Sequence, residues 1–156
     1  MEISRRKIIQ IIIVILSILA VAVLGSLFVN LGIDWFNGLQ KPSQWIPNIL
    51  IPIMWTIIYI TFGVVFTIWI IRSGIPTNII VWLIINGVLN IFWCLVFFTL
   101  HLTLIGNIVI ILNLIAGYTL LIQIIKSNQL YGMIISIYPI WLSLATSLNL
   151  ALWILN

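Results

Sequence analysis

The chain has 156 residues, of which 64% are hydrophobic and only 5% are charged. A water-soluble domain of this size cannot cover its surface with so few charged side chains, so the composition excludes that class and indicates an integral membrane protein. The formal net charge is +4, but apart from Arg5-Arg6-Lys7 the basic residues stand singly, which excludes a nucleic-acid-binding surface. The single cysteine, Cys94, excludes an internal disulfide and a cysteine-based zinc site.

Five long apolar runs, separated by charged residues, prolines and short polar breaks, predict an all-α integral membrane bundle of five transmembrane helices. A helix of about 20 apolar residues crosses the ~30 Å hydrocarbon core of a bilayer. We expect residues 1–156 to form a single domain, with a long first loop at residues 30–46. The expected helices cover residues 8–29, 47–71, 78–100, 104–125 and 130–154.

The first apolar run has two interpretations. A cleaved signal peptide is one, because a basic triplet precedes the run and Ala20-Val21-Ala22 offers a small-x-small cleavage site. The run continues through Val29, however, which favours a retained membrane span. With the N-terminus in the cytoplasm, Lys41 is the only Lys or Arg that lies outside, as the positive-inside rule requires. We therefore expect a bacterial cell-membrane protein with a cytoplasmic N-terminus and an outside C-terminus.

The second expected helix carries an aromatic face. A helix that faces lipid needs only aliphatic side chains, so a full-length aromatic face is expected to pack on protein or on a flat ligand. Pro47 and Pro52 are expected in the first turns, where proline is best tolerated. Five rings recur along the helix at spacings of 4, 3, 4 and 3 residues, and they are Trp55, Tyr59, Phe62, Phe66 and Trp69.

The third expected helix places two amides on an aromatic face. Asn86 and Asn90 stand one turn apart, on the face that also carries Trp82, Trp93 and Phe97. An unpartnered carboxamide in hydrocarbon is costly, so both amides must meet protein, water or a ligand. Hydrogen bonds between helices are one interpretation, and contact with a ligand is the other.

Small residues mark one face of the fourth expected helix. Gly106, Asn113 and Gly117 share this face and predict the close approach of another helix. On the fifth helix, the small Ala145 lies one turn from Trp141 and leaves room beside that ring.

The aromatic faces of the second, third and fifth helices converge near the middle of the membrane. Trp55, Trp93 and Trp141 then contribute to an apolar pocket with few polar groups, which is the general profile of a small-molecule site. The alternative is an aromatic core that simply fills the bundle of a structural membrane protein.

Four stretches, in order along the chain, resemble the translocator protein family, also called tryptophan-rich sensory protein (TspO) or peripheral benzodiazepine receptor. The resemblance covers residues 32 to 149. The stretches are the loop run Gly32–Ser43; Trp55, Tyr59 and Gly63 in the second helix; the run Leu89–Phe98 in the third; and Tyr138-Pro139-Ile140-Trp141 followed by Ala145–Asn149 in the fifth.

This resemblance implies a ligand pocket that opens under the first loop and binds flat apolar molecules. It also implies that the protein forms a homodimer in the lipid bilayer. The implied ligands are tetrapyrroles such as protoporphyrin or haem, and isoquinoline or benzodiazepine compounds, with no required cofactor and no metal. The residues implied to bind ligand are Phe36, Trp55, Tyr59, Phe62, Asn90, Trp93, Phe97, Trp141, Ala145 and Leu148.

The resemblance also allows an enzyme-like alternative. In it, porphyrin is broken down oxidatively or under light, with Trp55 and Trp141 as the redox-active side chains.

The first loop is expected to close over the pocket mouth, since loops that do so exclude water and slow release of the ligand. The competing role for its Trp45 is anchoring at the lipid headgroups.

Overall fold

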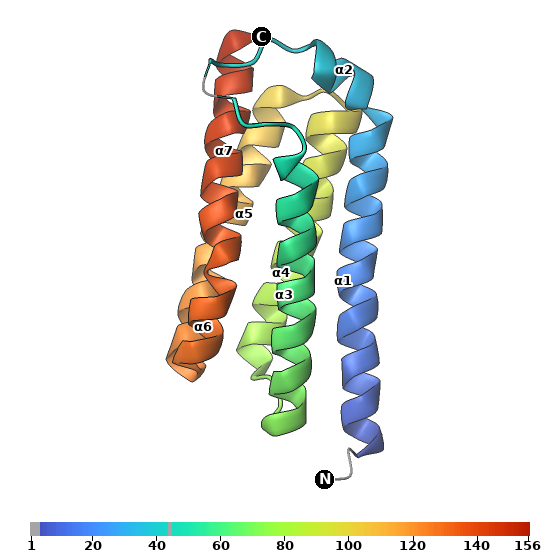
Figure 1. Cartoon of the computed structure of the whole chain (residues 1–156), viewed down its shortest axis with the longest axis vertical. Coiled ribbons are helices and arrows are strands. Elements are labelled where there is room, and N and C mark those ends of the chain that lie inside the picture. The colour runs from blue at the N-terminus through green and yellow to red at the C-terminus, as the bar shows by residue number, and fades with distance from the viewer. Residues whose placement is uncertain (1–3, 44) are drawn as a thin grey trace.

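The computed structural model of the chain describes residues 4–43 and 45–156; residues 1–3 and Gln44, which falls in the expected first loop, lie outside the described residues. Within that range, five helical rods are long and apolar enough to cross a membrane, which confirms the predicted fold class (Figure 1). These rods are α1 (Arg5–Leu31), α3 (Leu50–Arg72), α4 (Thr77–Cys94) with η1 (Leu95–Thr99), α5 (Thr103–Ser127), and α6 (Gln129–Ile135) with α7 (Ile137–Leu155).

The rods form one bundle in which α1 packs against α3 and α4, while α5 packs against α4 and α7. The two termini lie at opposite ends of this bundle (Figure 1). The start of α1 and the ends of α3 and α5 share one end, so Arg5-Arg6-Lys7, Arg72 and Lys126 gather there. Lys41 lies in the connection at the other end. This charge distribution supports the predicted topology, in which the basic end faces the cytoplasm.

The first connection differs from the expected long loop. It contains a short helix, α2 (Ile33–Gly38), and α3 begins at Leu50 rather than at residue 47. Pro47 therefore lies ahead of the helix, where its carbonyl oxygen accepts a hydrogen bond from the Leu50 amide at 2.9 Å. Only Pro52 lies in the first turn of α3, where proline is tolerated because the backbone N–H there has no partner within the helix. Two prolines five residues apart cannot both lie in that one turn.

The third rod ends in a π-helix, η1, that the sequence did not predict. Its wider turn is seen in the bond from the Leu100 amide to the Leu95 carbonyl oxygen at 3.0 Å. Such turns occur frequently at functional sites. The fifth rod breaks at Ser136, between α6 and α7, three residues before Pro139.

Glycines allow close helix contacts where larger residues would clash. A Cβ added to Gly106 would lie 2.9 Å from a ring carbon of Phe97, and one added to Gly117 would lie 3.3 Å from the Tyr138 ring. Both glycines and Asn113 are buried. The predicted close approach on this face of α5 is therefore confirmed.

Aromatic rings fill much of the bundle interior, in two groups of buried side chains. The upper aromatic cluster, near the end of the bundle that carries α2, includes Phe36, Trp93, Phe97, Phe98 and Trp141. The lower aromatic cluster, nearer the basic end, includes Phe66, Trp69 and Tyr131.

Candidate functional site

The aromatic face of α3 turns toward the interior of the bundle, as predicted. Phe66 and Trp69 are buried, whereas Trp55, Tyr59 and Phe62 are half-buried. Neighbouring rings contact one another along the face, with 5.9 Å between the ring centroids of Trp55 and Tyr59. The upper half of this face therefore has ring surface that the protein itself does not cover.

A cavity of about 570 Å³ lies along this uncovered ring surface, between α1, α3 and α4. Its volume falls within the range of roughly 300–1,000 Å³ that is typical of small-molecule sites. Four of the predicted ligand-binding residues line it, and they are Trp55, Tyr59, Phe62 and Asn90. Tyr138 of α7 closes its inner side.

The two amides of α4 have different surroundings. Asn86 donates from Nδ2 to the Trp82 carbonyl oxygen at 2.8 Å, and its Oδ1 accepts from the Tyr138 hydroxyl at 3.0 Å. Asn90 also lines the cavity, where its side chain lies within hydrogen-bonding reach of the Tyr138 hydroxyl. Both amides therefore belong to the cavity wall. Asn86 also joins α4 to α7 through its bond to the Tyr138 hydroxyl.

A second group of buried amides joins α4, α5 and α7 in the upper half of the bundle. The Trp93 indole donates from Nε1 to Asn149 Oδ1 at 3.2 Å, and Asn149 Nδ2 donates in turn to Asn107 Oδ1. This network directs the Trp93 ring away from the cavity. Asn107 was missed at the sequence level, although an Asn inside an apolar run is a signal for such a contact.

The other six predicted binding residues do not line the cavity. The upper aromatic cluster contains four of them, Ala145 packs against that cluster, and Leu148 lies half-buried on α7. The filled-core interpretation describes this part of the bundle well. The four in the cluster are Phe36, Trp93, Phe97 and Trp141.

Residues of α1 that the sequence did not single out form one wall of the cavity. They include Gln10, Val14, Ser17 and Val21. Gln10 and Ser17, two polar residues seven positions apart on one helical face, were a signal for this wall, whereas Val14 and Val21 look like the lipid-facing aliphatic residues of α1.

The first connection covers the upper end of the bundle. Trp45 packs against the upper aromatic cluster, and Lys41 Nζ lies 5.0 Å from the Phe36 ring centroid. The Gln40 amide donates to Asn156 Oδ1 at 2.9 Å, which ties the connection to the C-terminus. No residue of the described part of this connection lines the cavity. The connection therefore sits over the upper aromatic cluster.

His101, the only histidine, follows η1 in a left-handed backbone conformation (φ 56°). Its imidazole stacks on the Trp35 indole, with 4.3 Å between ring centroids and 14° between ring planes. It does not line the cavity.

The chain is similar to proteins of one family along most of its length. Residues 13–154 match the model of the TspO/MBR family. The chain is 30% identical over 146 residues to "Tryptophan-rich protein TspO" of Archaeoglobus fulgidus, which covers 91% of this chain and 94% of that protein. It is 28% identical over 126 residues to "Protein CrtK" of Rhodobacter capsulatus, which covers 78% of each chain. The resemblance based on the loop and helix motifs is confirmed.

Proposed function

Because the chain belongs to the TspO/MBR family, we propose that it is a membrane receptor or transporter that binds flat conjugated molecules inside its helical bundle. The proposed ligands are tetrapyrroles such as protoporphyrin and haem, and isoquinoline or benzodiazepine compounds. The observation that carries the proposal is the cavity of about 570 Å³ beside the uncovered rings of α3. A sensing or transport role follows from reversible binding within the membrane.

The chemistry of the cavity suits such ligands. Trp55, Tyr59 and Phe62 present ring surface on one wall, and offset stacking on such rings favours a planar aromatic molecule. Aliphatic side chains of α1 and α4 form the other walls. Asn90 supplies the hydrogen-bonding group that orients the ligand, since few well-placed polar groups are enough to do so in an apolar pocket.

Protoporphyrin titration of the purified protein in lipid nanodiscs tests the proposal. In the dark, we expect a saturable shift of the porphyrin absorption band together with quenching of tryptophan fluorescence. An isoquinoline carboxamide should compete for the same site. The absence of saturable binding by both ligands would refute the proposed function and favour a structural membrane protein with a filled core.

Porphyrin breakdown is the second candidate, favoured by the position of Trp55 in the cavity wall. A ligand stacked there is in contact with an oxidisable indole, whereas Trp141 lies in the upper aromatic cluster. Illumination of the same complex in air supplies light and oxygen as the oxidant. Loss of the porphyrin band with a new product would support this candidate, and a stable spectrum would leave binding alone.

We further propose that the protein is a homodimer with a cytoplasmic N-terminus. The gathering of basic residues at one end of the bundle supports this orientation. Native mass spectrometry from nanodiscs tests the stoichiometry. Labelling of an Asn37→Cys variant by an impermeant thiol reagent on intact cells tests the orientation, since Asn37 is exposed at the end opposite Arg5.

A further inference from the structure

The cavity opens sideways, and we propose that its ligand enters from the bilayer through a slot between α1 and α4. The slot is bounded by Ile13 and Ser17 on α1 and by Ile80 and Ile84 on α4, all of which line the cavity. This inference rests on the function proposed above. It adds the route of entry and the class of ligand, which is a lipophilic molecule already dissolved in the membrane.

Side-chain exposure locates the opening. The rim residues Ile13 and Ile84 are 57% and 61% exposed, whereas Phe66 and Ile70 on the α3 floor are 1% and 2% exposed. All four line the same cavity. The cavity therefore has a closed floor on α3 and an open side between α1 and α4.

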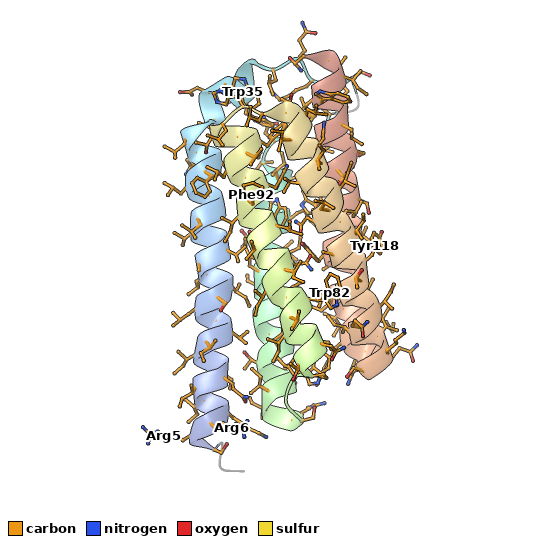
Figure 2. All side chains as sticks on the ribbon, turned by 180° about the vertical axis from the view of Figure 1, so that it is seen from behind. Arg5, Arg6, Trp35, Trp82, Phe92 and Tyr118 are labelled. Carbon is orange, nitrogen blue, oxygen red and sulfur yellow. The ribbon has the colours of Figure 1, made fainter. Side chains whose placement is uncertain are left out.

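Close contacts end the slot toward α2. A Cβ added to Gly87 of α4 would lie 3.2 Å from Val21 Cγ2, and farther up one added to Gly25 of α1 would lie 3.6 Å from Cys94 Sγ. The two helices are thus in contact from Val21 upward. Figure 2 shows α1 and α4 separating from there toward the end that carries Arg5 and Arg6.

Below Val21, α1 lies against α3, where a Cβ added to Gly63 would lie 3.6 Å from Ile15 Cδ1. The Lys7 ammonium donates to the Ile71 carbonyl oxygen at the end of α3, at 2.6 Å. Among the described residues, no hydrogen bond joins α1 to α4 along the slot. Gly25 is the only buried residue of α1. The lower half of α1 is therefore held by few buried contacts, and such segments move at low free-energy cost.

The slot selects the chemistry of the ligand. Its rims are aliphatic except for Ser17, whose hydroxyl donates to the Ile13 carbonyl oxygen at 2.8 Å. A ligand that passes between them must therefore be apolar along most of its edge, because a charged group at bilayer depth is costly. Gln10 lines the lower end of the cavity, one turn from Arg6 and Lys7. A carboxylate on the ligand can remain at this basic, headgroup-level end while the ring system stacks on α3.

Bridging the rims tests this route. The variant Ile13→Cys/Ile80→Cys places one thiol on each rim, roughly two turns below the Val21–Gly87 contact. It is made in a Cys94→Ala background, which removes the buried natural thiol. A cleavable bismaleimide then ties α1 to α4 across the opening. Stopped-flow tryptophan quenching by protoporphyrin in nanodiscs gives association and dissociation rates.

Relative to the same double-cysteine protein before the linker is added, we expect bridging to slow both association and dissociation about tenfold, because the linker narrows the opening through which the ligand enters and leaves. Cleavage of the linker should restore both rates. The matched control is Tyr118→Cys/Ser143→Cys, bridged in the same way; these hydroxyls lie 3.1 Å apart on α5 and α7, away from α1 (Figure 2). The control bridge should change neither rate.

Two outcomes would overturn the inference, and they are distinguishable. Unchanged rates in the bridged Ile13→Cys/Ile80→Cys protein, with the bridge verified by mass, would contradict entry through the slot while leaving the site intact. Absence of saturable protoporphyrin binding even in the unbridged Cys94→Ala protein and the natural protein would instead refute the proposed function, and the route with it.

Discussion

Trp55 connects the cavity to the interior of the bundle. Its ring lines the cavity, and its centroid lies 6.4 Å from that of Trp93 in the upper aromatic cluster. Trp141, in contrast, is buried in that cluster, and its indole Nε1 has no hydrogen-bond partner among the described residues. Of Trp55 and Trp141, only Trp55 can stack directly on a molecule in the cavity.

We predict that Trp55→Phe weakens protoporphyrin binding about fivefold, because the loss of one stacked aromatic pair costs about 1 kcal/mol. Trp141→Phe should have a smaller effect, because this side chain does not line the cavity. Absorption titration measures both, with Trp82→Phe as the control outside the cavity. If Trp141→Phe weakens binding more than Trp55→Phe, the ligand occupies the upper aromatic cluster instead.

The two amides of α4, which both lie in the cavity wall, should differ in their effect on stability. Asn86→Leu removes the bond to the Tyr138 hydroxyl, and we expect it to lower the free energy of unfolding by about 1 kcal/mol, as is usual for hydrogen bonds between membrane helices. Asn90→Leu leaves the bond between Asn86 and Tyr138 in place, so it should lower stability less, and it should weaken ligand binding because it removes a polar group from the cavity wall. Thermal unfolding and ligand titration of both variants check this, and reversed effects would contradict the assignment.

At the scale of elements, the contact between the end of α1 and η1 depends on the absence of a side chain. A Cβ on Gly32 would lie 1.8 Å from the Phe98 carbonyl oxygen, which is backbone and cannot rotate away. The Thr99 hydroxyl donates to the Phe28 carbonyl oxygen at 2.8 Å across the same contact. The π-helical turn of η1 thus lies against the end of α1.

Gly32→Ala should therefore lower the free energy of unfolding by about 1–3 kcal/mol, the usual cost of overpacking. The matched control is Gly38→Ala at the end of α2, where an added Cβ meets no atom within 4 Å. Circular dichroism melts of both variants in detergent measure the difference. Equal melting temperatures would show that η1 shifts freely and that the contact is loose.

The first connection should anchor the upper end rather than control the cavity. Trp45 donates from its indole Nε1 to Asn48 Oδ1 at 2.8 Å and packs against the upper aromatic cluster, away from the slot. Trp45→Ser should therefore leave protoporphyrin association and dissociation rates unchanged in stopped-flow experiments. A raised dissociation rate would instead support the connection as a cover over the ligand.

At the scale of the whole molecule, the lengths of apolar runs were enough to predict five helices, because a bilayer demands about 20 apolar residues per span. The position of Pro47 and the π-turn at Leu95 were not predictable in this way. The hydrogen-bonding pattern at a helix end can change without any change in the hydrophobicity of the residues there. Aromatic spacing correctly indicated the inward face of α3.

The cavity wall contributed by α1 shows where sequence reasoning reached its limit. In a soluble protein, polarity marks the outer face of a helix, but in a bilayer both faces are aliphatic. Val14 and Val21 of α1 were therefore indistinguishable from lipid-facing neighbours. Trp141 of α7 was expected in the pocket, yet the structure packs it into the filled upper part of the bundle. Tyr138 of α7, which was not expected there, lines the cavity.

The central claim is that ligand lies between α1, α3 and α4, and photoaffinity mapping tests it most directly. An isoquinoline carboxamide with a diazirine is irradiated with the protein in nanodiscs, and labelled residues are identified by mass spectrometry, with excess protoporphyrin as competitor. We predict competed labels on α1 between Gln10 and Val21 and on α4 between Ile80 and Ile91. Labels confined to α7 between Trp141 and Leu148 would contradict the account.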